Sequence, residues 1–231
     1  GLLVRVERRF SRRMQFLASY AYSSNVGYNG GTIGFNVFNN DDWFETYGPL
    51  ERDISHILNF SGVIELPWRL QVGFNSSHYS KLPFTASVAN MDFNGDGTNG
   101  DVLPGTNVNR FNRGLGKGDL RGLVDRFNHT LAGTRTPHGQ LIPKITLPAE
   151  YAFGDTYITQ DVRVSRSFTF HDRYKLMLIG EAFNLLNIAN LSGYAGNLAN
   201  AATFGQPTRR VDQVFGSGGP RAFQLAARLS F

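Results

Sequence analysis

The last stretch of the chain alternates strictly between apolar and polar side chains. From residue 221 to residue 231 every second position is apolar, namely Phe223, Leu225, Ala227, Leu229 and Phe231. Because successive side chains of a strand point to opposite faces, this pattern predicts a strand with one apolar and one polar surface. A strand of about ten residues with this pattern is typical of the wall of an outer-membrane barrel.

Six further stretches show the same two-residue period. In one of them, Leu58, Phe60 and Ile64 alternate with mostly polar neighbours. The predicted strands cover residues 2–10, 14–23, 54–66, 69–79, 157–170 and 174–186, followed by the C-terminal strand. We therefore expect an all-β fold of about seven antiparallel strands.

The connections between the predicted strands fall into two length classes. The first, third and fifth strands are followed by tight turns at 11–13, 67–68 and 171–173. The second, fourth and sixth strands are followed by long loops at about 24–53, 80–156 and 187–220. Such long loops are uncommon in compact domains, whereas short periplasmic turns and long extracellular loops are typical of outer-membrane barrels. Residues 1–231 are thus predicted to form the C-terminal part of an antiparallel transmembrane β-barrel.

Aromatic residues flank both ends of the predicted strands. The short-turn side has Phe10, Trp68, Phe168, Phe170, Tyr174 and Phe231, and the long-loop side has Tyr20, Tyr22 and Tyr79. Strands are rich in aromatic residues in general. Placement at the two strand ends, however, favours membrane interfaces, where amphipathic rings lie at the level of the lipid head groups.

Composition narrows the class of protein further. The chain is 41% hydrophobic and has no apolar run of about 18 residues, so no transmembrane helix is expected. Cysteine is absent, which excludes disulfides and thiolate metal sites. The net charge of +5 raises nucleic acid as a partner. The basic residues are scattered without an aromatic-interleaved binding motif, so no nucleic acid is expected.

Seven strands do not close a bacterial single-chain barrel, which has an even number of at least eight. An open sheet would leave unpaired backbone groups in hydrocarbon. The sequence starts at Gly1, without Met or a signal segment. We expect earlier strands and a plug upstream of residue 1. The alternative is that several copies close one barrel together.

Three segments near the C-terminus resemble the last strands of TonB-dependent outer-membrane receptors. They are DVRVSRSF at 161–168, GEAFNLLNIAN at 180–190 and GPRAFQLAARLSF at 219–231. The similarity is firmest from about residue 157 onward and is closest to the Oar-like branch, whose receptors carry a carboxypeptidase-regulatory-like N-terminal domain.

The resemblance implies a barrel of about 22 strands with an N-terminal plug, energised by TonB and importing large or scarce ligands. The plug and a TonB box are not within these residues. The resemblance also implies that Phe223, Leu225, Ala227, Leu229 and Phe231 form the signal that the barrel-assembly machinery recognises.

The second long loop contains a candidate calcium site. Oxygen ligands at alternate positions of a glycine-loosened turn can converge on one hard cation, and Ca²⁺ suits them. The candidate ligands are Asp92, Asn94, Asp96, the carbonyl of Thr98, and Asp101. Leu103 stands where such loops carry a bidentate Glu, so Asp101 would have to replace it, and no EF-hand is predicted. The alternative is a surface loop rich in Asn, Asp and Gly that binds no metal.

Charged residues on the predicted polar faces point to structural pairing. Arg163 and Glu181 lie on strands joined by a tight turn, so we expect a cross-strand ion pair in the barrel lumen. Catalysis finds no support, because the sequence contains no H-E-x-x-H pair, no G-x-S-x-G elbow and no P-loop. We expect that the protein is not an enzyme.

The favoured hypothesis is a TonB-dependent receptor of the bacterial outer membrane. Its partners would be outer-membrane lipid, the barrel-assembly machinery, an unknown extracellular ligand and, through an N-terminal region, TonB. A second hypothesis is a self-associating structural or adhesive surface protein whose loops bind calcium. A third is a soluble β-sandwich binding module.

Overall fold

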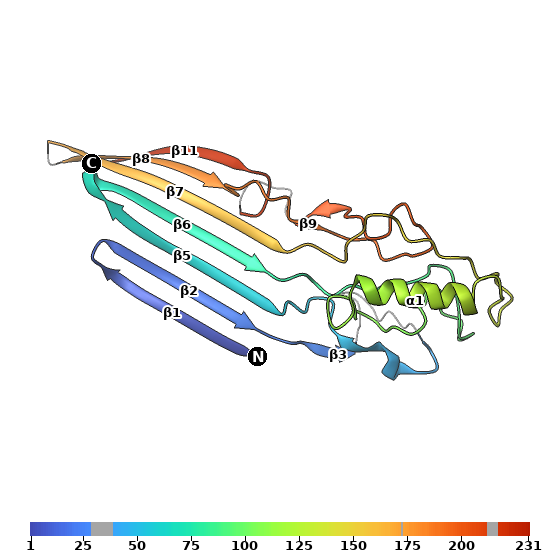
Figure 1. Cartoon of the computed structure of the whole chain (residues 1–231). Coiled ribbons are helices and arrows are strands. Elements are labelled where there is room, and N and C mark those ends of the chain that lie inside the picture. The colour runs from blue at the N-terminus through green and yellow to red at the C-terminus, as the bar shows by residue number, and fades with distance from the viewer. Residues whose placement is uncertain (29–38, 172, 212–216) are drawn as a thin grey trace.

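The computed structural model describes residues 1–28, 39–171, 173–211 and 217–231. Its main element is one antiparallel sheet of seven strands in the order β1-β2-β5-β6-β7-β8-β11 (Figure 1). The strands are β1 Leu2–Ser11, β2 Met14–Tyr22, β5 His56–Leu66, β6 Leu70–Tyr79, β7 Tyr157–Phe170, β8 Tyr174–Phe183 and β11 Ala222–Ser230. Each of the first six pairs with the long strand that follows it in the chain. The predicted all-β, antiparallel fold is confirmed.

Two strand ends differ from the prediction by two residues or more. Strand β8 ends at Phe183 rather than at residue 186, because Asn184 has a left-handed backbone (φ 47°) and donates its N–H to Asp161 on β7 (2.8 Å). Strand β5 begins at His56 rather than at residue 54. There the hydroxyl of Ser23 donates to the carbonyl of Ile54 (3.1 Å).

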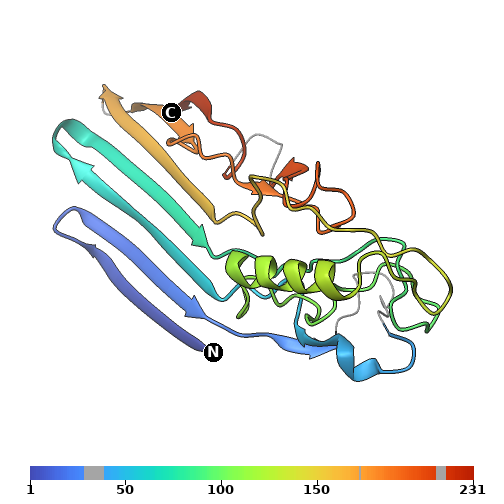
Figure 2. The same cartoon turned by 45° about the vertical axis from the view of Figure 1, so that its right-hand side comes forward.

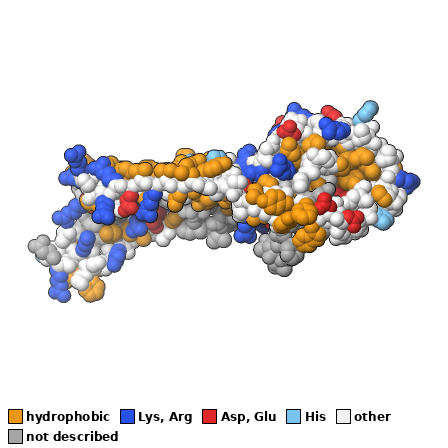
Figure 3. Space-filling model, turned by 90° about the horizontal axis from the view of Figure 1, so that it is seen from below, with side chains coloured by type: hydrophobic (Ala, Val, Ile, Leu, Met, Phe, Trp, Pro, Cys, Tyr) orange, Lys and Arg blue, Asp and Glu red, His pale blue; other side chains and the backbone are white. Residues whose placement is uncertain are grey.

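The register gives the sheet two continuous faces. One row across it is Met14, Ile64, Val72, Val164, Gly180 and Leu225, and the next row is Gln15, Val63, Gly73, Arg163, Glu181 and Gln224. We call these the apolar face and the polar face. Figure 3 shows hydrophobic side chains along one side of the sheet and charged side chains on the other. Leu225 is 89% exposed, so the apolar face at this strand has no protein layer over it.

All the long loops lie at one end of the sheet, and the tight turns lie at the other (Figures 1 and 2). The turn between β5 and β6 is the 3₁₀ turn η2 (Pro67–Arg69). At the far end the loops fold into what we call the loop body. Its elements are β3 Val26–Tyr28, η1 Trp43–Thr46, β4 Tyr47–Pro49, α1 Lys117–Thr130, β9 Leu191–Ser192 and β10 Arg209–Arg210.

The buried hydrophobic core lies in the loop body and not in the sheet. Phe111 and Phe153 pack together with ring centroids 4.7 Å apart and planes tilted by 44°, and Phe84 packs on both. Its fully buried side chains include Val88, Leu103, Phe111, Leu120 and Phe204. The second and third long loops therefore form one packed unit. Within the described residues no helix is long and apolar enough to cross a membrane.

Helix α1 was not predicted from the sequence. Leu120, Val124 and Phe127 are buried on one of its faces, at the i, i+4, i+7 spacing of an amphipathic helix. Asp119 caps its first turn by accepting the N–H of Gly116 (2.7 Å). Only a long loop was expected at about 80–156, and this helix was missed, although the spacing of its apolar residues is visible in the sequence.

Gly62 on β5 allows an aromatic side chain to lie flat on the apolar face. A Cβ at this position would come within 2.7 Å of both the Gln15 carbonyl oxygen and the Phe74 ring. The Phe74 ring lies 4.9 Å from that of Phe60. The missing side chain of Gly62 thus makes room for the contact between neighbouring strands.

The substitution Gly62→Ala is expected to destabilise the sheet by about 1–3 kcal/mol, because the Gln15 carbonyl is backbone and cannot move aside easily. The matched control is Gly122→Ala on the exposed side of α1, where a Cβ meets nothing within 4 Å. It should raise stability by about 0.5–1 kcal/mol. Urea unfolding of the full-length protein in detergent measures both. Equal effects of the two substitutions would contradict this role of Gly62.

Candidate functional site

A buried ion pair fastens the loop body to the strand ends. Arg113, in the second long loop, donates from Nε to the Asp53 carboxylate (2.5 Å), just before β5. Its guanidinium also donates to the carbonyl oxygens of Asp53 and Lys81. The other carboxylate oxygen of Asp53 accepts the N–H of Asn25, past the end of β2 (2.8 Å). One guanidinium and one carboxylate therefore link the ends of three neighbouring strands to the loop body.

Two asparagines of the same loop extend this attachment. Asn112 donates from its amide to the carbonyls of Leu82 (2.8 Å) and Phe153 (2.7 Å). Asn109 donates to the carbonyl of Pro49 in the first long loop (2.9 Å). Together, the charge-assisted bonds of Arg113 and the bonds from the two asparagines to backbone carbonyls fix one arrangement of the loops at the end of the sheet.

A second buried polar cluster holds the third long loop to β7. The amide of Asn184 donates to the carbonyls of Ile188 (2.8 Å) and Gly219 (2.6 Å), and that of Asn190 donates to the carbonyl of Gly218 (3.1 Å). Both asparagines are fully buried. This cluster fixes the segment that leads into β11.

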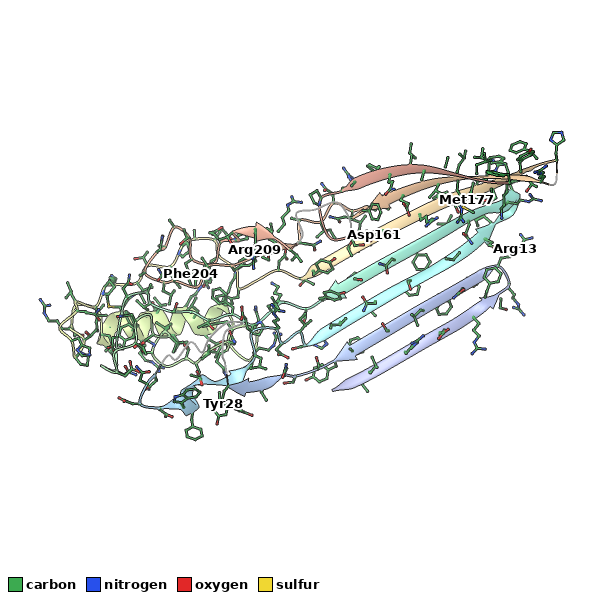
Figure 4. All side chains as sticks on the ribbon, turned by 180° about the vertical axis from the view of Figure 1, so that it is seen from behind. Arg13, Tyr28, Asp161, Met177, Phe204 and Arg209 are labelled. Carbon is green, nitrogen blue, oxygen red and sulfur yellow. The ribbon has the colours of Figure 1, made fainter. Side chains whose placement is uncertain are left out.

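A pocket of about 550 Å³ lies where the loop body meets the sheet. Tyr79 and Tyr157, at the ends of β6 and β7, stack there with ring centroids 4.9 Å apart and an interplanar angle of 17°. They are register partners on the polar face. Phe84, Phe153, Tyr194, Asp155, Arg209 and Ser217 complete much of the wall. Figure 4 shows Arg209 at this junction.

The chemistry of the pocket is aromatic, with polar groups around it. Burial, and then the negative charge of Asp155, raise the pKa of Tyr194 above its ordinary value, so its hydroxyl stays protonated and can donate a hydrogen bond. Arg209 and Asp155 add one charge of each sign. Apolar walls with a few convergent polar groups are typical of small-ligand sites.

The structure brings Arg163 and Glu181 together on the polar face. They are direct partners across β7 and β8, with Nη1 of Arg163 3.6 Å from Oε1 of Glu181. They line a second hollow of about 450 Å³ over the sheet, together with Asn75 and Asp161. The Arg163 side chain is about half exposed, and such a pair contributes about 0–1 kcal/mol.

The Asp/Asn/Gly loop folds as a series of tight turns. Asp92 accepts the N–H groups of Gly95 (2.6 Å) and Gly97 (3.0 Å) with its two carboxylate oxygens. Asn94 accepts the N–H of Asp96 (3.2 Å), and Asp96 accepts that of Thr98 (2.7 Å). These side-chain oxygens therefore already accept backbone N–H groups within the loop.

Asp101 joins this group from the other strand of the loop. It accepts the N–H of Phe93 (2.7 Å) and the hydroxyl of Thr98 (3.2 Å). Burial, and then the charges of Asp92 and Asp96, raise the pKa of Asp101 despite these bonds. Burial also acts to raise the pKa of Asp96, but bonds from Thr98, Asn40 and Asn94 outweigh it and leave that pKa lowered. Among the residues with a described placement, no group of three or more His, Asp or Glu side chains is arranged to hold a metal ion.

The C-terminal strand β11 lies at the edge of the sheet and presents its large side chains outward. Phe223, Leu225, Leu229 and Phe231 are 60–89% exposed. Its partner is β8, through Leu225 opposite Gly180 and Leu229 opposite Leu176. The other edge of the sheet is β1.

Sequence reasoning missed the attachment and the pocket. Arg113 stood among several arginines of a long loop, and Asp53 carried no distinguishing pattern. The pocket aromatics come from two strands and both of the later loops, so only the packed loop body brings them together. The sequence offered one signal for the pocket, namely Tyr79, which was predicted to be an aromatic residue of the membrane interface at the end of a strand.

The substitution Arg113→Met is expected to release the loop body, because it leaves the buried Asp53 carboxylate without its cation. Breaking a buried pair in this way costs about 3–5 kcal/mol. Hydrogen exchange of residues 80–130 in the full-length protein should become faster. The control Arg126→Met, on the exposed side of α1, should change stability by less than about 0.5 kcal/mol. Unchanged exchange in the Arg113 variant would show that the ion pair does not hold the loop body.

Comparison with known proteins identifies the family. A family model described as an outer membrane beta barrel domain matches residues 1–224. Searches of curated proteins and of solved structures found no match. The matched range covers the first six long strands completely and the first residues of β11, with the two-faced register and the sorted turns and loops described above. The chain belongs to the outer membrane beta barrel domain family, and its location is the bacterial outer membrane.

Proposed function

We propose that these residues form the last wall strands and the surface loops of a TonB-dependent receptor, which captures a ligand outside the cell and passes it across the outer membrane. The observation that carries this proposal is the aromatic pocket on the polar face, beneath a loop body with its own core. No catalytic step is part of the proposal. The partners are lipid, the barrel-assembly machinery, the ligand and TonB.

The two faces of the sheet match the two environments of a barrel wall. The apolar face contacts lipid, and the polar face lines the lumen. Strands of 9–14 residues are long enough to cross the hydrocarbon layer when tilted. Tyr79 and Tyr157 of the pocket lie on the polar face, so a ligand bound there would lie at the start of the path through the barrel.

Strands β1 and β11 need partners from outside residues 1–231. Their outer edges carry unpaired N–H and C=O groups, which are too costly to leave in hydrocarbon. We propose that further strands of the same polypeptide pair with both edges and close the barrel. Closure by several copies of this chain is the competing arrangement, and it would support the adhesive or structural alternative.

Ligand capture would depend on the rigid attachment of the loop body. The Arg113–Asp53 pair and the asparagine bonds hold the loop segments whose Phe84 and Phe153 line the pocket together with Tyr79 and Tyr157. A planar or apolar group of a ligand would stack on the tyrosines. Arg209, Asp155 and the Tyr194 hydroxyl would bind its polar groups. Pre-organised walls lower the entropic cost of binding.

The substitution Tyr79→Ala should lower ligand uptake by about fivefold to tenfold, because one face of the stacking site is lost. The matched control is Tyr22→Ala, at the same end of β2 but on the apolar face. Uptake is measured by growing cells that carry the full-length protein in defined medium and determining by mass spectrometry which nutrients they deplete. Depletion should require functional TonB. Depletion that continues at the same rate without TonB would contradict the receptor proposal.

A calcium ion in the Asp/Asn/Gly loop is a second proposal. It is supported by the tight turns that bring Asp92, Asn94 and Asp96 close together in the loop. With Asp101 and the Thr98 carbonyl they provide the hard oxygen set that Ca²⁺ prefers. The ion would offset the repulsion among three carboxylates and stiffen the loop body.

Calcium binding should depend on pH through Asp101. The ion needs the charged carboxylate, and the pKa of Asp101 is raised. Affinity is therefore present above that pKa and is lost as pH falls through it, at a higher pH than for an ordinary aspartate. Calorimetric titration of the full-length protein with Ca²⁺ measures this. The substitution Asp96→Asn should weaken binding by about tenfold, whereas Asp125→Asn on α1 should not. A titration at neutral pH that shows no heat of calcium binding would contradict the calcium proposal.

A further inference from the structure

The short-turn end of the sheet is rich in arginine. Figure 3 shows Lys and Arg side chains gathered at the end of the sheet that lies away from the loop body. The short turns place this end at the periplasmic rim of the proposed barrel wall. The register places Arg8 and Arg166 on its lipid-facing side, and Arg12 and Arg173 lie in the tight turns next to them.

The register places Arg166 on the apolar face. It pairs with Leu70 on β6 and with Leu178 on β8, so it continues a row of aliphatic side chains. Leu70 directly follows the η2 turn, so Arg166 lies opposite the first residue after the turn that contains the exposed Trp68. Arg8 on β1 follows Val4 and Val6 on the same face and pairs with Phe16. A cation among lipid-facing apolar residues is tolerated where its head group reaches the interface.

Aromatic rings hold two of these guanidinium groups at the rim. Arg166 lies over the Phe168 ring at 4.9 Å from its centroid, and Arg173 lies over the Tyr174 ring at 5.6 Å. Both arginines are exposed. A guanidinium that stacks on a ring keeps its N–H edge free for other partners.

Acidic residues do not neutralise this side of the rim within the described part of the chain. Glu65 pairs with Gln71 on the polar face. The ion pairs that the structure shows involve Arg5, Arg113, His138 and Arg163, and none of the four rim arginines. Asp172, in the same turn as Arg173, lies outside the described residues. The chemistry that complements several unpaired guanidinium groups at head-group depth is phosphate.

We propose that the periplasmic rim binds the phosphate groups of anionic phospholipids in the inner leaflet of the outer membrane. Arg166 and Arg173 would contact the phosphates, and Phe168, Tyr174 and Trp68 would lie beside them at the boundary between the head groups and the acyl chains. The site would fix the depth of β7 and β8 in the bilayer. It selects phosphatidylglycerol over phosphatidylethanolamine, because only the former keeps a net negative charge at neutral pH. The inference depends on the barrel assignment alone, and it does not depend on the ligand or on TonB.

Native mass spectrometry of the full-length protein from mixed vesicles of phosphatidylglycerol and phosphatidylethanolamine tests this site. The wild-type protein should retain phosphatidylglycerol preferentially. The double substitution Arg166→Gln with Arg173→Gln should lower that retention by about 25-fold, at about fivefold for each arginine. The matched control is Arg121→Gln with Arg126→Gln on the exposed side of α1, which removes the same charge and should leave retention unchanged.

Two further measurements keep the test decisive if the rim variant does not fold. Lysine at both positions should preserve most of the preference, because the charge remains. The preference of the wild-type protein should also weaken as salt rises from about 0.1 M to about 1 M. Equal retention of the two lipids by the wild-type protein, or unchanged phosphatidylglycerol retention in a folded rim variant, would overturn the proposal.

Discussion

The structure depends on one constraint, that every backbone N–H and C=O group in hydrocarbon must have a partner within the protein. The seven long strands satisfy it for each other along their paired residues, with an antiparallel register from β1 to β11 that shifts between Arg8 and Ser11. The constraint also explains the alternation of side chains, because a paired strand in a barrel wall always has one face toward lipid and one toward the lumen. It leaves the outer edges of β1 and β11 as the two places where the described structure is incomplete.

The loop body follows a different rule from the wall. The wall has almost no buried side chains of its own in this chain, whereas the loop body has a conventional core around Phe84, Phe111 and Phe153. The Arg113–Asp53 pair and the buried asparagines couple the two parts. A hydrophobic core of the kind found in water-soluble proteins is thereby held at the end of the membrane-spanning sheet, and the pocket lies where the two parts meet.

The wall was predictable from the sequence to within a few residues, because each strand has a strict two-residue period and each tight turn lies between two such periods. The positions of Arg163 opposite Glu181 and of the aliphatic rows follow from the same alternation. Strand ends were less certain: Asn184 stops β8 through its left-handed backbone and its bond to Asp161, which is a tertiary effect.

The loop body was not predictable to the same degree. Its contacts join residues far apart in the chain, such as Arg113 with Asp53 and Phe84 with Phe204. Such contacts leave no periodic pattern in the sequence from which they could be predicted. Helix α1 is the exception, since its apolar spacing was present in the sequence. The pocket depends on these long-range contacts, and so it emerged only from the folded structure.

The central claim is that these strands are part of one larger single-chain barrel. The most direct test is the intact mass, with peptide mapping, of the native protein extracted from outer membranes. Our account predicts a single polypeptide several times heavier than 25.7 kDa, with further amphipathic strands that pair with β1 and β11. A native polypeptide of 25.7 kDa would contradict it and would show that copies of this chain close the barrel together.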